Sequence, residues 1–99
     1  MRLMILSLLI LASCASPAPQ FFGATKHEVE LEGIRFAVFV KETEAEVIRL
    51  GYLSRKNRVR VPDLMMQAAA QASGCRAIPN SLTSRIPRDT GEGRVDLDC

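Results

Sequence analysis

The sequence predicts an α+β fold in which a small antiparallel sheet of three to five strands packs against one helix and is stapled by one disulfide. Three observations lead to this prediction. Apolar and charged residues alternate over residues 28–40 around a break at Gly33, as in a hairpin. A run of helix formers occupies residues 64–73. Cys75 follows that run and Cys99 ends the chain, so the two cysteines can join the helix to the last strand.

The first two strands are predicted from a repeat of two residues. Val29 and Leu31 alternate with glutamates, and Ile34 and Phe36 resume the alternation after the turn. A two-residue turn at Glu32-Gly33 places Leu31 opposite Ile34, and Val29 opposite Phe36. One register therefore puts all four apolar side chains on one face of the sheet.

Two further strands are expected before the helix. Residues 45–53 suit either a strand or a short helix, and their β-branched residues together with Gly51 favour the strand. Residues 58–61 alternate charged and apolar side chains, which indicates another short strand.

The helix is bounded by clear start and stop signals. Pro62 suits its first turn, Asp63 complements its dipole, and Gly74 stands where a C-cap glycine belongs. Polar residues at four-residue spacing mark the solvent side. The packing side is then expected to comprise Leu64, Met65, Ala68, Ala69 and Ala72.

The last strand is predicted over residues 94–99, after an irregular stretch of about seventeen residues that exceeds the usual loop length. Val95, Leu97 and Cys99 share one face of this strand, so Cys99 points inward toward Cys75. We expect these cysteines to form a disulfide in an oxidising compartment, and a pair of unpaired buried thiols is the alternative.

The amino terminus has the layout of a secretory signal, in which a short basic start precedes a ten-residue apolar run over residues 3–12. The run is too short to cross a hydrocarbon core, which takes about twenty apolar residues. Leu11-Ala12-Ser13-Cys14 resembles the lipobox of bacterial lipoproteins, and the resemblance covers only the first fourteen residues. It implies cleavage before Cys14, a diacylglycerol on its thiol and an acyl group such as palmitate on its amine. A plain secretory signal cut at Ala15 or Ala18 is the alternative.

These signals divide the chain into a signal peptide over residues 1–13, a lipidated Cys14 with a flexible tether over residues 14–25, and a small domain over residues 26–99. Within the tether, Phe21-Phe22 could dock on the domain or dip into the membrane interface. The residue after Cys14 is Ala15. In enteric bacteria an Asp at this position resembles an inner-membrane retention mark. An outer-membrane position facing the periplasm is therefore favoured over the inner membrane.

The net charge of the chain and its one dense basic cluster indicate which classes of partner to expect. Removal of the leader lowers the formal charge from +2 to +1 because Arg2 leaves with it, so no affinity for nucleic acid is expected. The dense basic cluster is interpreted either as a contact for anionic lipid head groups, lipopolysaccharide phosphates or an acidic partner, or as a solvated strand face. It comprises Arg55, Lys56, Arg58 and Arg60.

No catalytic or metal-binding set is recognisable. His27 is the sole histidine and has no second His or Cys nearby, and no base accompanies the hydroxyls of the long loop. The spacing of the late acidic residues does not follow an EF-hand. We therefore expect no metal, no cofactor and no enzymatic activity. The residues considered for these roles are Ser81, Thr83, Ser84, Asp89, Glu92, Asp96 and Asp98.

The leading functional hypothesis is a membrane-anchored, non-enzymatic envelope accessory or protein-interaction module. It would present either residues 76–93 or an open sheet edge to another envelope protein. A periplasmic ligand-binding or hydrolase-inhibitor module is the alternative, and a plain secreted protein follows if Cys14 is not lipidated.

Overall fold

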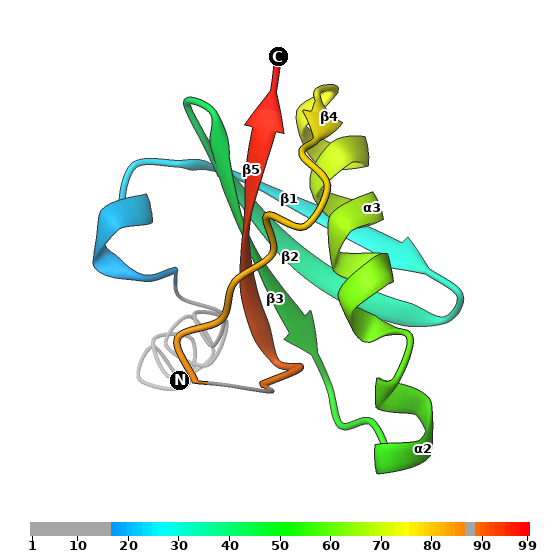
Figure 1. Cartoon of the computed structure of the whole chain (residues 1–99). Coiled ribbons are helices and arrows are strands. Elements are labelled where there is room, and N and C mark those ends of the chain that lie inside the picture. Colours follow the sequence, from blue (N-terminus) through cyan, green and yellow to red (C-terminus); the bar gives the residue numbers. More distant parts are fainter. Residues whose placement is uncertain (1–16, 87–88) are drawn as a thin grey trace, which may run out of the picture.

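A computed structural model of the chain describes residues 17–86 and 89–99 (Figure 1). The predicted leader and Cys14 lie outside the described residues. The α+β prediction is confirmed, because a curled antiparallel sheet of order β1-β2-β3-β5-β4 packs against one main helix, α3. The elements are η1 (Pro19–Phe21), β1 (Thr25–Leu31), β2 (Ile34–Lys41), β3 (Glu44–Leu50), α2 (Arg55–Arg58), α3 (Val61–Ser73), β4 (Arg76–Ala77) and β5 (Glu92–Asp98).

The predicted hairpin has the predicted register. Leu31 pairs with Ile34 and Val29 pairs with Phe36. Glu32 and Gly33 both have positive φ, at 52° and 81°, as a tight two-residue turn of this kind requires. The strand alternative for residues 45–53 is also confirmed, since β3 covers most of this range.

The sheet is covered on both faces, which explains the nearly continuous apolar run in β2. α3 covers one face, and its predicted packing residues are buried or half-buried in the main core. The 3-10 helix η1 and its N-cap residue Ala18 cover part of the other face, where Ala18 and Phe21 pack with Ala37 and Phe39. Alternate residues of β2 therefore enter two different cores. The main core comprises Val29, Ile34, Phe36, Val38, Ala45, Val47, Val61, Leu64, Met65, Ala68, Ala69, Val95 and Leu97.

The structure differs from the flexible tether predicted over residues 14–25 from Ala18 onward. Ala18 is only 4% exposed and Phe21 only 1%, and both lie on the sheet rather than extending from it. The reason is that Ala37 and Phe39 offer an apolar surface on the face that α3 leaves uncovered. The folded domain thus begins before residue 26, the boundary expected from the sequence.

The prediction of a strand over residues 58–61 is wrong. The segment instead ends the short helix α2 and begins α3 at Val61, shortly before the predicted start. Pro62 fits the first turn of α3, and Val61 is buried there while Val59 is 83% exposed. The alternation of charged and apolar residues reflects two helix ends rather than one strand.

The predicted disulfide is confirmed and joins the end of α3 to the end of β5. Cys75 and Cys99 are bonded across a sequence separation of 24, with their Cα atoms 4.5 Å apart. Gly74 adopts the left-handed conformation of a helix C-cap, and its N–H donates to the Ala70 carbonyl at 2.9 Å. This cap turns the chain so that Cys75 faces the last strand.

Candidate functional site

The residues after β3 form a projection that we call the basic tip, consisting of Tyr52, Arg55, Lys56, Arg58 and Val59. Figure 1 shows that α2 projects at the end of the molecule opposite the C-terminus. Arg58 is fixed within the tip, because its Nε donates to the Leu53 carbonyl at 2.7 Å and its guanidinium lies 5.6 Å from the centre of the Tyr52 ring. The tip is therefore an ordered arrangement and not only a run of charges.

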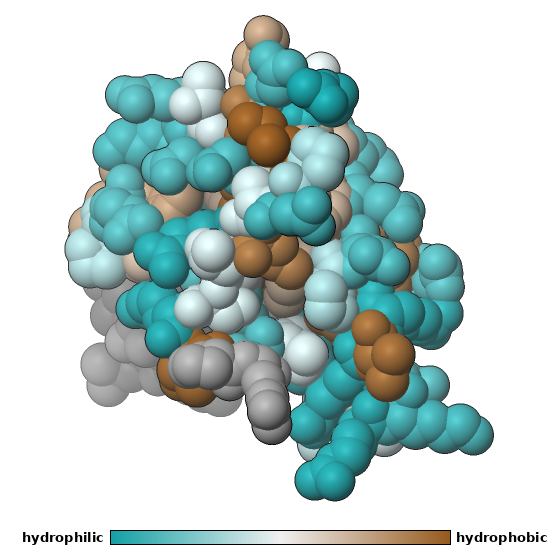
Figure 2. Space-filling view, in the orientation of Figure 1, coloured by the Kyte–Doolittle hydropathy of each residue, from teal (hydrophilic) through white to brown (hydrophobic). Residues whose placement is uncertain are grey.

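Three of the four basic residues predicted to act together lie in the tip. Arg60 points elsewhere and forms an ion pair with Glu32 of the β1–β2 turn. Within residues 17–86 and 89–99, no ion pair involves Arg55, Lys56 or Arg58. Hydrophilic side chains cover this end of the molecule in Figure 2. The tip thus carries positive charge that no acidic side chain of the described chain neutralises.

A cavity of about 550 Å³ lies beside α2. Arg55, Arg58 and Val59 line one side, and Thr90, from the segment before β5, lines the other. The Thr90 hydroxyl accepts a hydrogen bond from Arg49 Nη1 at 3.1 Å, which leaves its own proton available for donation. The cavity therefore presents donors and positive charge.

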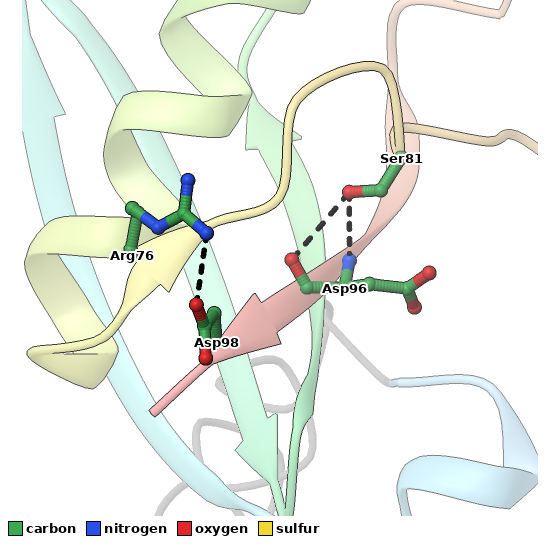
Figure 3. Close-up of polar contacts among 4 residues, drawn as sticks. All are labelled: Arg76, Ser81, Asp96 and Asp98. Atoms are coloured by element: carbon green, nitrogen blue, oxygen red, sulfur yellow. Dashed lines mark hydrogen bonds and ion pairs between the residues drawn. The ribbon is translucent and has the colours of Figure 1, made fainter.

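The long loop that the sequence offered as an interaction surface is instead tied to the outer edge of β5. Thr83 and Arg94 exchange backbone hydrogen bonds of 2.9 and 2.7 Å. The Ser81 hydroxyl accepts from the Asp96 N–H at 3.0 Å, and Arg76 and Asp98 form an ion pair of 2.8 Å close by (Figure 3). The loop thus covers the edge of β5.

The structure does not bring the sole imidazole and the loop hydroxyls together. His27 lies on β1 at one edge of the sheet, whereas the loop runs along β5, with β2 and β3 between them. Ser84 is engaged with backbone, since its hydroxyl donates to the Glu92 carbonyl at 2.6 Å. Among the described residues, no group of three or more His, Cys, Asp or Glu side chains could hold a metal ion.

A buried carboxyl pair lies beneath the amino-terminal segment and was missed from the sequence. Glu46 is fully buried and Glu92 nearly so, on the neighbouring strands β3 and β5. The Ala18 N–H donates to Glu46 Oε1 at 2.7 Å, and the Arg85 N–H donates to Glu92 Oε1 at 3.3 Å. The second oxygen of each carboxyl has no hydrogen-bond partner in the described part of the chain. Nothing in the sequence shows that Ala18 covers that face of the sheet and buries Glu46.

The environment of this pair favours a proton on Glu46. Burial raises the pKa of the Glu46 carboxyl above its ordinary value, and the interaction with the Glu92 side chain raises it further. The Ala18 N–H and the charge of Arg85 lower this pKa, with smaller effects than burial. Arg94 lies directly opposite Glu46 on β5. We infer that the Glu46 carboxyl binds a proton more readily than an exposed glutamate does.

Replacing Glu46 with Gln is expected to remove part of the dependence of stability on pH. A carboxyl with a raised pKa in the folded state stabilises the fold fully below its unfolded pKa near 4.5, and this contribution is lost as the pH rises through the raised pKa. The amide introduced by the substitution keeps a donor toward Glu92 at every pH. Urea unfolding between about pH 4 and pH 8 should therefore show the E46Q variant losing less stability than the wild type as the pH rises.

The Glu46→Ala variant is the matched control, because it also removes the acceptor of the Ala18 N–H. We expect it to be less stable than E46Q by about 1–3 kcal/mol across the same pH range. Parallel declines of wild type and E46Q with rising pH would contradict the raised pKa of Glu46.

Comparison with protein-family models, with curated proteins and with solved structures finds no match to this chain. Residues 17–86 and 89–99 contain no helix with the length and apolar character that a membrane span requires. The function proposed below therefore rests on the chain's own residues.

Proposed function

We propose that this chain is the precursor of a small, non-enzymatic lipoprotein of the bacterial envelope, which serves as an accessory or interaction module for another envelope protein. Lipid on Cys14 would hold it on a membrane, the outer membrane facing the periplasm being favoured. The observation that carries the proposal is the Cys75–Cys99 disulfide in a chain whose first fourteen residues resemble a lipoprotein leader. Such bonds persist in oxidising compartments such as the periplasm and are rare in the cytosol.

The short connection between Cys14 and the domain supports an accessory that stays close to its membrane. Because the Ala18 N–H is held by Glu46, only residues 15–17 separate the lipidated cysteine from a fixed point on the sheet. At an extended length of at most about 3.6 Å per residue, Ala18 can lie no further than about 14 Å from the Cα of Cys14. The domain then works beside the bilayer.

The outer edge of β1 is the surface that best suits a protein partner. Among the described residues, β1 pairs only with β2, which leaves the backbone groups of its other edge available to an added strand. The opposite edge of the sheet is covered by β4 and by the loop along β5. The sequence offered two surfaces, residues 76–93 and an open sheet edge. The geometry favours the open edge as the partner surface.

A photo-crosslinking residue at Glu30 of β1 tests this surface in the membrane-bound protein. Glu30 is exposed on the edge strand, and Gln67, exposed on α3, is the matched control position. We expect irradiation of intact envelopes to give one discrete adduct from position 30 and none from position 67. Equal adducts at both positions, or none at position 30, would overturn the assignment of the edge.

A further inference from the structure

We propose that the basic tip is a second membrane contact, which docks on the headgroups of anionic phospholipids in the bilayer that holds the anchor. The inference rests on the proposed function, because lipid on Cys14 is what keeps the tip near a membrane. It goes beyond that function because it names the class of lipid that the domain contacts and the residues that orient the domain on the membrane.

The cavity at the tip has the chemistry of a phosphate site. Arg55 and Arg58 both line it, and the guanidinium group of arginine matches phosphate oxygens with paired donors. Thr90 adds a hydroxyl from the facing segment. Because no ion pair within residues 17–86 and 89–99 involves these arginines, a phosphate would not have to displace an acidic side chain.

The apolar residues of the tip match the layer beneath the headgroups. Tyr52 is 86% exposed and Val59 is 83% exposed, and they stand beside the same basic side chains. One exposed Tyr or Val is ordinary on a protein surface, but tyrosine beside lysine and arginine is the composition found at membrane interfaces. Arg58, held over the Tyr52 ring, keeps charge and aromatic group together. The combination favours a lipid surface over a purely acidic protein partner.

Position within the molecule agrees with this assignment. The tip projects from the sheet at the end opposite the C-terminus (Figure 1), where no other described element covers it. The link between Cys14 and Ala18, at most about 14 Å, keeps the start of the domain near the bilayer surface. An anionic leaflet attracts a basic segment that comes within about one Debye length of it, about 8–10 Å at physiological salt.

Tyr52 provides a direct test, because it is the only tyrosine and the chain has no tryptophan. The lipidated protein is reconstituted in vesicles of phosphatidylcholine alone or of phosphatidylcholine with phosphatidylglycerol, in both cases with bromine on the acyl chains close to the headgroup. We expect bromine to quench most of the tyrosine emission in the anionic vesicles and little in the zwitterionic ones. High salt should restore the emission, since it screens the attraction.

A charge variant and a matched control make the test specific. Arg55→Gln with Lys56→Gln leaves Tyr52 and Arg58 in place and should abolish the quenching in anionic vesicles. Lys26→Gln with Arg76→Gln removes the same charge from exposed positions outside the tip and should leave the quenching unchanged. The effect of salt on the unmodified protein serves as the second measurement if either variant folds poorly.

Four results would overturn the proposal. The first two are equal quenching in both kinds of vesicle and no quenching in either. The third is that the control variant loses as much quenching as the charge variant. The fourth is that millimolar inorganic phosphate removes the quenching, which would assign the cavity to a soluble anion. Flotation of the same vesicles separates this proposal from the proposed function. Protein that floats with unquenched Tyr52 retains its anchor and refutes only the tip, whereas purified chain without acyl groups refutes the anchor.

Discussion

Replacing both Cys75 and Cys99 with Ser is expected to lower the free energy of unfolding by about 3–4 kcal/mol. The bond closes a loop with a sequence separation of 24, and opening it restores the conformational freedom of that loop to the unfolded chain. A domain of this size has a total stability of only about 5–15 kcal/mol at best, so the loss is large. Urea unfolding followed by circular dichroism measures it.

Reduction of the wild type supplies the control for this double variant. Because the loop is opened in both, the reduced wild type and the Ser variant should unfold at the same urea concentration, well below the oxidised wild type. A difference of less than about 1 kcal/mol between oxidised and Ser forms would mean that the hydrophobic core alone fixes β5 against α3.

Replacing Phe21 with Ala is expected to destabilise the domain by about 3 kcal/mol, because this ring is the main apolar contact of η1 with the second face of the sheet. Phe21 is 1% exposed and packs with Ala37 and Phe39, so its removal leaves a cavity beside them. The loss should also loosen Ala18 and expose Glu46 to water. Hydrogen exchange of the Ala18 amide, measured together with urea unfolding, reports both effects.

The neighbouring Phe22 is the matched control, since it has the same side chain and is 61% exposed. We expect Phe22→Ala to change the free energy of unfolding by less than about 0.5 kcal/mol. If the two variants were equally stable, the amino-terminal segment would not be part of the folded domain, and the boundary at residue 26 predicted from the sequence would stand.

The elements that the sequence predicted well are those with strong local signals. A turn at Gly33 between two alternating runs defines the first hairpin and its register, and Pro62 with Gly74 bounds the main helix. The disulfide could be predicted because one cysteine follows the helix and the other follows the last strand, although Cys99 lies just beyond β5 and is exposed rather than inward-facing as predicted. In each case, neighbouring residues carry the information.

The features that the sequence did not reveal depend on contacts between distant segments. Residues 17–24 are rich in small residues and proline, as a tether is, and only the apolar second face of the sheet explains why they pack. Ala18 of that segment also covers Glu46, whose burial no local pattern indicates. The cavity at the basic tip likewise needs Thr90, which is more than thirty residues away from Arg55 in the sequence.

The intact mass of the protein purified from membrane fractions, with and without reductant, tests the central claim most directly. We predict a chain that begins at Cys14, carries two or three acyl groups, and gains the mass of a pair of hydrogen atoms on reduction, while a Cys14→Ser variant carries no lipid. Full-length chain that retains Met1, bears no acyl group and is recovered from the cytosol would contradict the account.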